Sequence, residues 1–224
     1  MLKIGHRGAE GYEPENTMTS FRKAIELGAD GIELDVHLSA DGHVVVIHDH
    51  TLERTTNGNG AVSDLSLQQL KLLRIVENEQ VPTLIEVLDE IKDVLVNIEL
   101  KGDGTALPVV EIVQNYIGRH RLKYQQIIVS SFDWVALQQV AELDPEIPIG
   151  VLTATDLDLA IGFAEFINAK ALHPQFHLLT TETTKQMQQK GFRVLTWTVN
   201  EPEDINLVKS YNVDGIISDF PDRL

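Results

Sequence analysis

Short apolar runs recur along the chain, and segments with the spacing of amphipathic helices separate most of them. The runs of strand length are Leu2–Gly5, Gly31–Val36, Val94–Leu100, Ile127–Ser131, Ile147–Leu152, Lys170–His173, Val194–Val199 and Gly215–Ser218. The predicted helices are Glu15–Leu27, Leu84–Ile91, Leu107–Tyr116, Val135–Leu143, Leu157–Phe166, Thr181–Gln189 and Asp204–Tyr211. Gly28 and Gly191 follow two of them as stop signals, and Pro202 stands where a first-turn proline belongs.

Regular alternation of strands and helices predicts a parallel sheet. Eight strands in 224 residues favour a closed (β/α)8 TIM barrel. The alternative is an open doubly wound sheet, but no G-x-G-x-x-G motif follows any of the strands. We therefore expect one α/β barrel domain over residues 1–224.

Two regions interrupt the alternation. Residues 32–49 show no helical spacing, and Asp41-Gly42 is a strong hairpin signal, so the second strand should extend and fold back. A turn centred on this dipeptide places position 35 opposite position 48. Residues 50–82 then form a small insertion that contains a capping box starting at Ser66 and opening a short helix, plausible as a lid or wall of a site.

The formal net charge of −16 argues against general binding to nucleic acid or to anionic membranes. No apolar run is long enough to cross a membrane, and no signal peptide is evident, which favours the cytoplasm. The absence of cysteine excludes disulfides and thiolate metal sites. The oligomeric state stays open.

Charged side chains gather where the predicted barrel strands end, which is where barrel enzymes place their active sites. They are His6, Arg7, Glu33, Asp35, His48, Glu99 and Lys101. Each is unremarkable alone, because a carboxylate or histidine at a strand end is usually a surface or ion-paired residue. Together they predict a site.

Glu33, Asp35 and Glu99 would repel one another at one rim unless a cation bound there. All-oxygen ligands favour Mg²⁺ or Ca²⁺. Arg7 and Lys101 would then bind a phosphate, which an acidic chain otherwise repels. Histidines on both sides can act as general base and general acid, so phosphoester cleavage is predicted, of a diester if an alkoxide must be protonated.

At these positions the sequence resembles the glycerophosphodiester phosphodiesterase family, of the superfamily that includes bacterial phosphatidylinositol phospholipase C. The similarity rests on the ordered series "HRG", "PENT", "ELDV" and "VIHD", and it continues through "TLERTTNGNG" and "TWTVN" to "VDGIISDFP". It therefore covers nearly the whole chain.

The resemblance implies a barrel that hydrolyses glycerophosphodiesters, in lipid and glycerol metabolism, to glycerol 3-phosphate and an alcohol. It implies His6 and His48 as the acid/base pair, and Glu33, Asp35 and Glu99 as metal ligands. It also implies attack by the glycerol 2-hydroxyl, a cyclic phosphate, and its opening by water. The order in which the histidines act stays open, although the expected hairpin register favours His48 as the first acid and His6 as the first base.

Weaker candidates surround these residues. Phe132 and Trp197 lie near strand ends and would form a pocket wall, or else pack in the barrel core. Glu15 would orient His6 or favour a helix N-terminus, and Asp49 would orient His48 or cap the insertion.

The remaining histidines carry no partner pattern. We expect His37 to be exposed, and the others to be structural or on the surface; they are His43, His50, His120, His173 and His177.

Two other functions fit parts of the pattern. A related barrel phosphodiesterase acting on lysophospholipids or sphingomyelin-type lipids would need an apolar surface at the barrel mouth, but the leucines of the insertion are mixed with Gln and Lys, as in a packed helix. A non-catalytic phosphate-binding barrel would lack a histidine or a carboxylate, and here every one is present.

Overall fold

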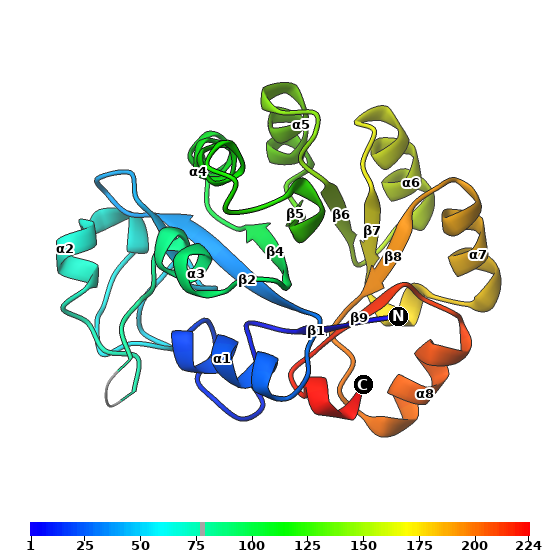
Figure 1. Ribbon diagram of the computed structural model, residues 1–224, viewed down its shortest axis with the longest axis horizontal. Coiled ribbons are helices and arrows are strands. Elements are labelled where there is room, and N and C mark those ends of the chain that lie inside the picture. The colour runs from blue at the N-terminus through cyan, green and yellow to red at the C-terminus, as the bar shows by residue number, and fades with distance from the viewer. Residues whose placement is uncertain (77–78) are drawn as a thin grey trace.

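The computed structural model describes residues 1–76 and 79–224. Eight parallel strands close into a barrel, because β1 pairs with both β9 and β2 (Figure 1). They are β1 (Leu2–Gly5), β2 (Gly31–Leu38), β4 (Leu95–Leu100), β5 (Ile127–Ser131), β6 (Ile149–Thr153), β7 (Ala171–Pro174), β8 (Arg193–Thr196) and β9 (Gly215–Ser218). The ninth strand, β3 (Val44–Val46), runs antiparallel to the end of β2. The TIM-barrel prediction, with a hairpin extension of the second strand, is confirmed.

Helices connect successive barrel strands and form the outer layer (Figure 1). They are α1 (Met18–Glu26), α3 (Leu84–Glu90), α4 (Ala106–Gly118), α5 (Trp134–Leu143), α6 (Leu157–Phe166), α7 (Thr181–Gln189) and α8 (Pro202–Ser210). A short 3₁₀ turn, Pro221–Arg223, lies after β9. Pro202 is the first residue of α8, as its sequence position predicts.

The first helix is shorter than predicted. It begins at Met18, not Glu15, because Asn16 adopts a left-handed backbone with φ of 55° and Thr17 caps the helix by accepting from the amide of Ser20. β8 likewise ends at Thr196, three residues before the predicted limit at Val199. Both differences release residues from regular structure at the carboxyl rim of the barrel.

Alternate residues along each strand face the helices or the barrel interior. On β2, Ile32 and Leu34 join the core beneath the helices, so Glu33 and Asp35 point inward. The lower interior is filled by a separate apolar cluster that includes Ile4, with Leu95, Ile128, Leu195 and Ile217.

One histidine is enclosed in the barrel interior. His173 on β7 pairs in register with Leu152, which lines a pocket at the barrel mouth. The side chain is completely buried, and neither ring nitrogen has a hydrogen-bond partner among the described residues. Its Nε2 lies over Gly150, where an added Cβ would be only 2.4 Å away. Burial lowers the pKa of His173 to about 3, so the ring is neutral.

The predicted hairpin register is wrong by one residue. Val36 pairs with Val46, and the amide of Ile47 donates to the carbonyl of Asp35, so position 35 lies opposite 47 and not 48. The cause is the loop length. Ser39 and His43 close a three-residue loop in which Gly42 takes a φ of 80°, whereas the prediction assumed a two-residue turn.

The segment after β3 packs as a lobe beside β2 and α1 (Figure 1, cyan). It contains α2 (Leu67–Leu70), and the Ser66 capping box at its start is confirmed. Its apolar side chains, among them Leu52, Val62 and Leu70, are buried against Val45 and Ile47. Residues 77 and 78 of the predicted insertion lie outside the described residues. Among the described helices, none has the length and apolar composition needed to span a bilayer.

Candidate active site

A pocket at the carboxyl rim brings all seven strand-end residues together. It has a volume of about 110 Å³. Its lining includes His6, Arg7, Glu33, Asp35, His48, Glu99 and Lys101, together with the aromatic candidates Phe132 and Trp197. Residues from β1, β2, β4 and the return of the hairpin therefore converge as the barrel topology requires.

Three carboxylates form the acidic side of the pocket. Glu33 and Asp35 are two residues apart on β2, and Glu99 on β4 pairs in register with Asp35. All three side chains are buried, with one oxygen from each within 4.8 Å of the others. Burial, then the charge of Asp35, raises the pKa of Glu33 to about 8 and that of Glu99 to about 6. The carboxylates thus resist ionising together, and a bound cation would relieve this.

Two basic side chains balance the carboxylates. Arg7 Nε is 3.4 Å from Asp35, and its backbone amide donates to Glu33 at 2.9 Å. Lys101 Nζ donates to Glu99 at 3.0 Å and lies 3.8 Å from Asp35. Two cationic side chains of a strongly acidic protein therefore lie in this one pocket, each paired with a carboxylate.

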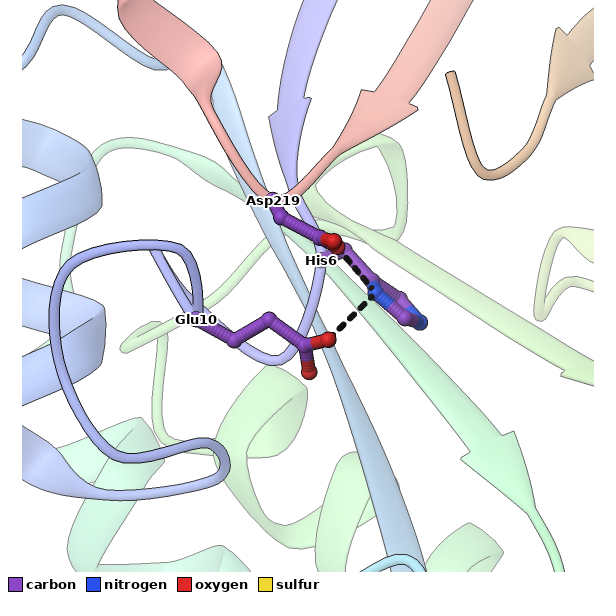
Figure 2. A group of neighbouring side chains, drawn as sticks. All are labelled: His6, Glu10 and Asp219. Carbon is purple, nitrogen blue, oxygen red and sulfur yellow. Dashed lines mark hydrogen bonds and ion pairs between the residues drawn. The ribbon is translucent and has the colours of Figure 1, made fainter. Parts of the chain in front are cut away.

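His6 is held by two carboxylates (Figure 2). Its Nδ1 lies 2.7 Å from Asp219 and 3.6 Å from Glu10. Asn200 donates to the second oxygen of Asp219 at 2.6 Å. Burial alone would lower the pKa of His6, but the hydrogen bonds to Asp219 and Glu10, with the charge of Glu33, raise it to about 10. Nδ1 therefore donates to Asp219, and within residues 1–76 and 79–224 no hydrogen bond engages Nε2.

His48 has a similar arrangement on the opposite flank. Its Nδ1 lies 2.6 Å from Asp49, as one of the two predictions for Asp49 required. Arg54 forms two hydrogen bonds to Asp49 and holds the pKa of that carboxyl well below its usual range. The carbonyl of His48 accepts from His37 Nε2 at 3.0 Å. His37 is 8% exposed, so the prediction that it is exposed is wrong: Gly102 packs on its ring.

Glu15 does not orient His6. Its carboxylate accepts from Arg7 at 2.9 Å and from Arg54 at 2.8 Å, so it fixes the direction of the Arg7 guanidinium. The alternative prediction, an N-terminal charge on the first helix, also fails because α1 starts later.

Several contributors were missed from the sequence, among them Glu10, whose carboxylate lies 3.6 Å from His6 Nδ1. Asp219, Asn200 and Arg54 act through other site residues, as described above. Asn16 is buried, donates to Asp35 Oδ2 at 2.9 Å and accepts from the Asp35 amide. Asp219 directly follows β9, so the strand-end rule that found the other residues also applies to it.

Phe132 and Trp197 form one wall of the pocket. Their ring centroids are 5.4 Å apart and nearly perpendicular. Trp197 Nε1 donates to the carbonyl of His173 at 2.8 Å, whereas Phe132 is 46% exposed. Both rings line the pocket, and Trp197 also packs against the apolar cluster of the barrel interior, so both alternatives apply to it.

The barrel and the contacts at its rim define a class of enzyme, the phosphoric diester hydrolases built on a (β/α)8 scaffold. The model of the glycerophosphoryl diester phosphodiesterase family matches residues 6–223, and the chain belongs to this family.

Relatives and solved structures agree with this assignment. The chain is 40% identical to a glycerophosphodiester phosphodiesterase of Caldanaerobacter subterraneus, over 100% of this chain and 96% of the relative. It is 36% identical to one of Bacillus altitudinis, with the same coverage. A phosphodiesterase of Oleispira antarctica, solved with the product sn-glycerol-3-phosphate, superposes with a TM-score of 0.90 at 29% identity, over 98% of this chain and 93% of that one. The Thermotoga maritima glycerophosphodiester phosphodiesterase gives a TM-score of 0.84 at 31% identity, over 99% and 96%.

Proposed function

We propose that the protein hydrolyses glycerophosphodiesters to sn-glycerol 3-phosphate and an alcohol by acid/base catalysis with His6 and His48. The observation that carries the proposal is that two imidazoles, each held at Nδ1 by a carboxylate, line one pocket with Arg7 and Lys101. The product bound to the Oleispira antarctica relative supports the identity of the phosphate product.

One divalent cation fits the residues present. Glu33, Asp35 and Glu99 offer three buried oxygen donors within 4.8 Å, a set that suits Mg²⁺ or Ca²⁺. The raised pKa values of Glu33 and Glu99 are what uncompensated ligands would have. When bound, the cation would lower the pKa of the glycerol 2-hydroxyl and stabilise negative charge on the phosphate.

The histidines move protons in two steps. In the first, the 2-hydroxyl oxygen bonds to phosphorus, one imidazole takes the hydroxyl proton at Nε2, and the other donates a proton to the departing alkoxide. In the second, water opens the cyclic phosphate and the two imidazoles exchange roles. The corrected hairpin register removes the argument that favoured His48 as the first acid. The proposed chemistry needs both histidines, whichever of them is the acid in the first step.

The remaining site residues hold the substrate. Arg7 and Lys101 bind the phosphate oxygens, with Glu15 fixing Arg7. Phe132 and Trp197 form the apolar wall against the departing alcohol, and Asp49 keeps the Nδ1 proton on His48. Small soluble glycerophosphodiesters are the proposed substrates of this pocket, and the cytoplasm is the proposed location of the protein.

Hydrolysis of glycerophosphocholine and glycerophosphoethanolamine with Mg²⁺ or Ca²⁺ tests the proposal. We expect turnover with at least one cation, reversible loss with EDTA, and loss of turnover in His6→Ala and His48→Ala. His120→Asn is the matched control, since His120 is an exposed histidine that does not line the pocket and its φ of 56° suits asparagine. Hydrolysis confined to lysophospholipids, or undiminished turnover in either alanine variant, would count against it.

A further inference from the structure

Arg54, in the lobe after β3, contacts two carboxylates at the edge of the pocket. Its Nε and Nη2 donate to the two oxygens of Asp49 at 2.6 and 2.9 Å. Its Nη2 also donates to Glu15 Oε1 at 2.8 Å, and Nη1 donates to Glu15 Oε2. One planar guanidinium thus engages both carboxylates, each through both oxygens, which a lysine ammonium could not reproduce.

Each of these carboxylates holds a residue that lines the pocket. Asp49 accepts from His48 Nδ1 at 2.6 Å, and Glu15 accepts from Arg7 Nη1 at 2.9 Å. Arg54 itself does not line the pocket. It therefore joins a residue that would transfer protons to a residue that would bind phosphate, through a continuous set of charge-assisted hydrogen bonds.

A purely stabilising role explains this arrangement poorly. Arg54 is 47% exposed, and although a bidentate network can stabilise an exposed arginine, stability alone does not require that both acceptors also hold pocket residues. Arg22 shows the ordinary case: it binds Glu90 with two donors, is also exposed, and touches no pocket residue. Arg54 differs because both of its acceptors are committed to site residues.

We propose that Arg54 is a positioning residue that couples the direction of the His48 imidazole to that of the Arg7 guanidinium. This inference rests on the proposed function of those two residues. Fixing Asp49 holds the His48 ring with Nε2 toward the substrate, and fixing Glu15 holds Arg7 against the phosphate. Small displacements of groups that act on the reacting atoms cost large factors in rate.

Steady-state kinetics on the hydrolysed glycerophosphodiester test the coupling. We expect Asp49→Asn mainly to lower kcat and Glu15→Gln mainly to raise KM. Arg54→Met should do both and lower kcat/KM by about 10- to 100-fold, the range found for residues that orient others in a site. The control Arg22→Met should change kcat/KM by less than about twofold.

Double variants separate positioning from independent effects. Arg54→Met should add little to the kcat loss of Asp49→Asn and little to the KM increase of Glu15→Gln, because each pair acts through one contact. Guanidinium ion at non-denaturing concentration should restore part of the activity of Arg54→Ala, since the position is exposed, and should leave Arg22→Ala unchanged.

Three results would overturn the inference: wild-type kcat and KM in Arg54→Met, full additivity in both double variants, or no restoration of Arg54→Ala by guanidinium. Failure of the proposed function is a different outcome, because it would appear as no glycerophosphodiester hydrolysis by the wild-type protein, or as undiminished turnover in His6→Ala or His48→Ala.

Discussion

Replacing His173 by leucine should alter how the stability of the protein depends on pH. His173 is completely buried in the barrel, and neither ring nitrogen has a partner among the described residues. Its folded pKa is about 3, well below the ordinary value of 6.5 that the unfolded chain would have. As the pH falls below 6.5, the unfolded state binds a proton that the folded state does not, so this histidine lowers stability in acid.

The magnitude follows from the difference in bound protons. Between pH 7.5 and 5.5, His173 in the unfolded chain changes from mostly neutral to mostly charged. Over this range its contribution to the free energy of unfolding falls by about 1.4 kcal/mol, which is the equivalent of one pKa unit. The folded pKa of about 3 lies so far below pH 5.5 that its precise value hardly affects this result. Both pH values stay above the sequence pI of 4.8, where solubility is lowest.

Urea unfolding at the two pH values, in EDTA to exclude cation binding, measures the effect. The stability of His173→Leu relative to wild type should rise by about 1.4 kcal/mol from pH 7.5 to 5.5. Other titrating groups cancel in this difference, including Glu33, whose raised pKa acts in the opposite sense. The free energy of unfolding of the exposed-histidine control His120→Asn should change between the two pH values by the same amount as that of wild type. If the free energy of unfolding of His173→Leu also changes by the same amount as that of wild type, the reasoning is refuted.

Three further predictions concern the site and the barrel interior. Cation binding at pH 7 should release about one proton, because the pKa of Glu33 is about 8 and the bound form needs the carboxylate. The release should vanish by pH 9.5. Calorimetry in buffers of different ionisation enthalpy measures the number of protons released, and a number that does not change with pH would contradict the prediction. Asp219→Asn should lower kcat by about 10- to 100-fold with little change in KM, because His6 loses its charged acceptor; unchanged kcat would exclude this role. Gly150→Ala should cost about 1–3 kcal/mol in urea unfolding, because the new methyl group meets His173, and should cost less in a His173→Ala background.

The seven strand-end residues could be brought together from the sequence because parallel strands end at one rim of a barrel. The spacing of Glu33 and Asp35 gives one strand face, and topology supplies the rest. His48 is the exception, because it follows the antiparallel strand β3 and was placed from the hairpin signal Asp41-Gly42.

The contacts around those residues depend on loop conformation, which the sequence pattern does not encode. Glu15 was predicted to orient His6 or to favour a helix N-terminus, but in a loop with left-handed backbone at Arg7 and Asn16 it binds Arg7 and Arg54 instead. Asp219 is separated from His6 by 213 residues, so no local pattern links them. The hairpin register failed for a similar reason, since one extra loop residue shifts every pair.

The bond between His6 and Asp219 crosses the seam where β1 meets β9 (Figure 2). A folding intermediate in which β9 has not yet docked would already contain Glu33, Asp35 and Glu99 on paired strands, yet its His6 would lack Asp219. If β9 docks last, catalysis would be regained only at that step. The time between the regain of helical circular dichroism and the regain of enzymatic turnover during refolding would then measure how late the barrel closes.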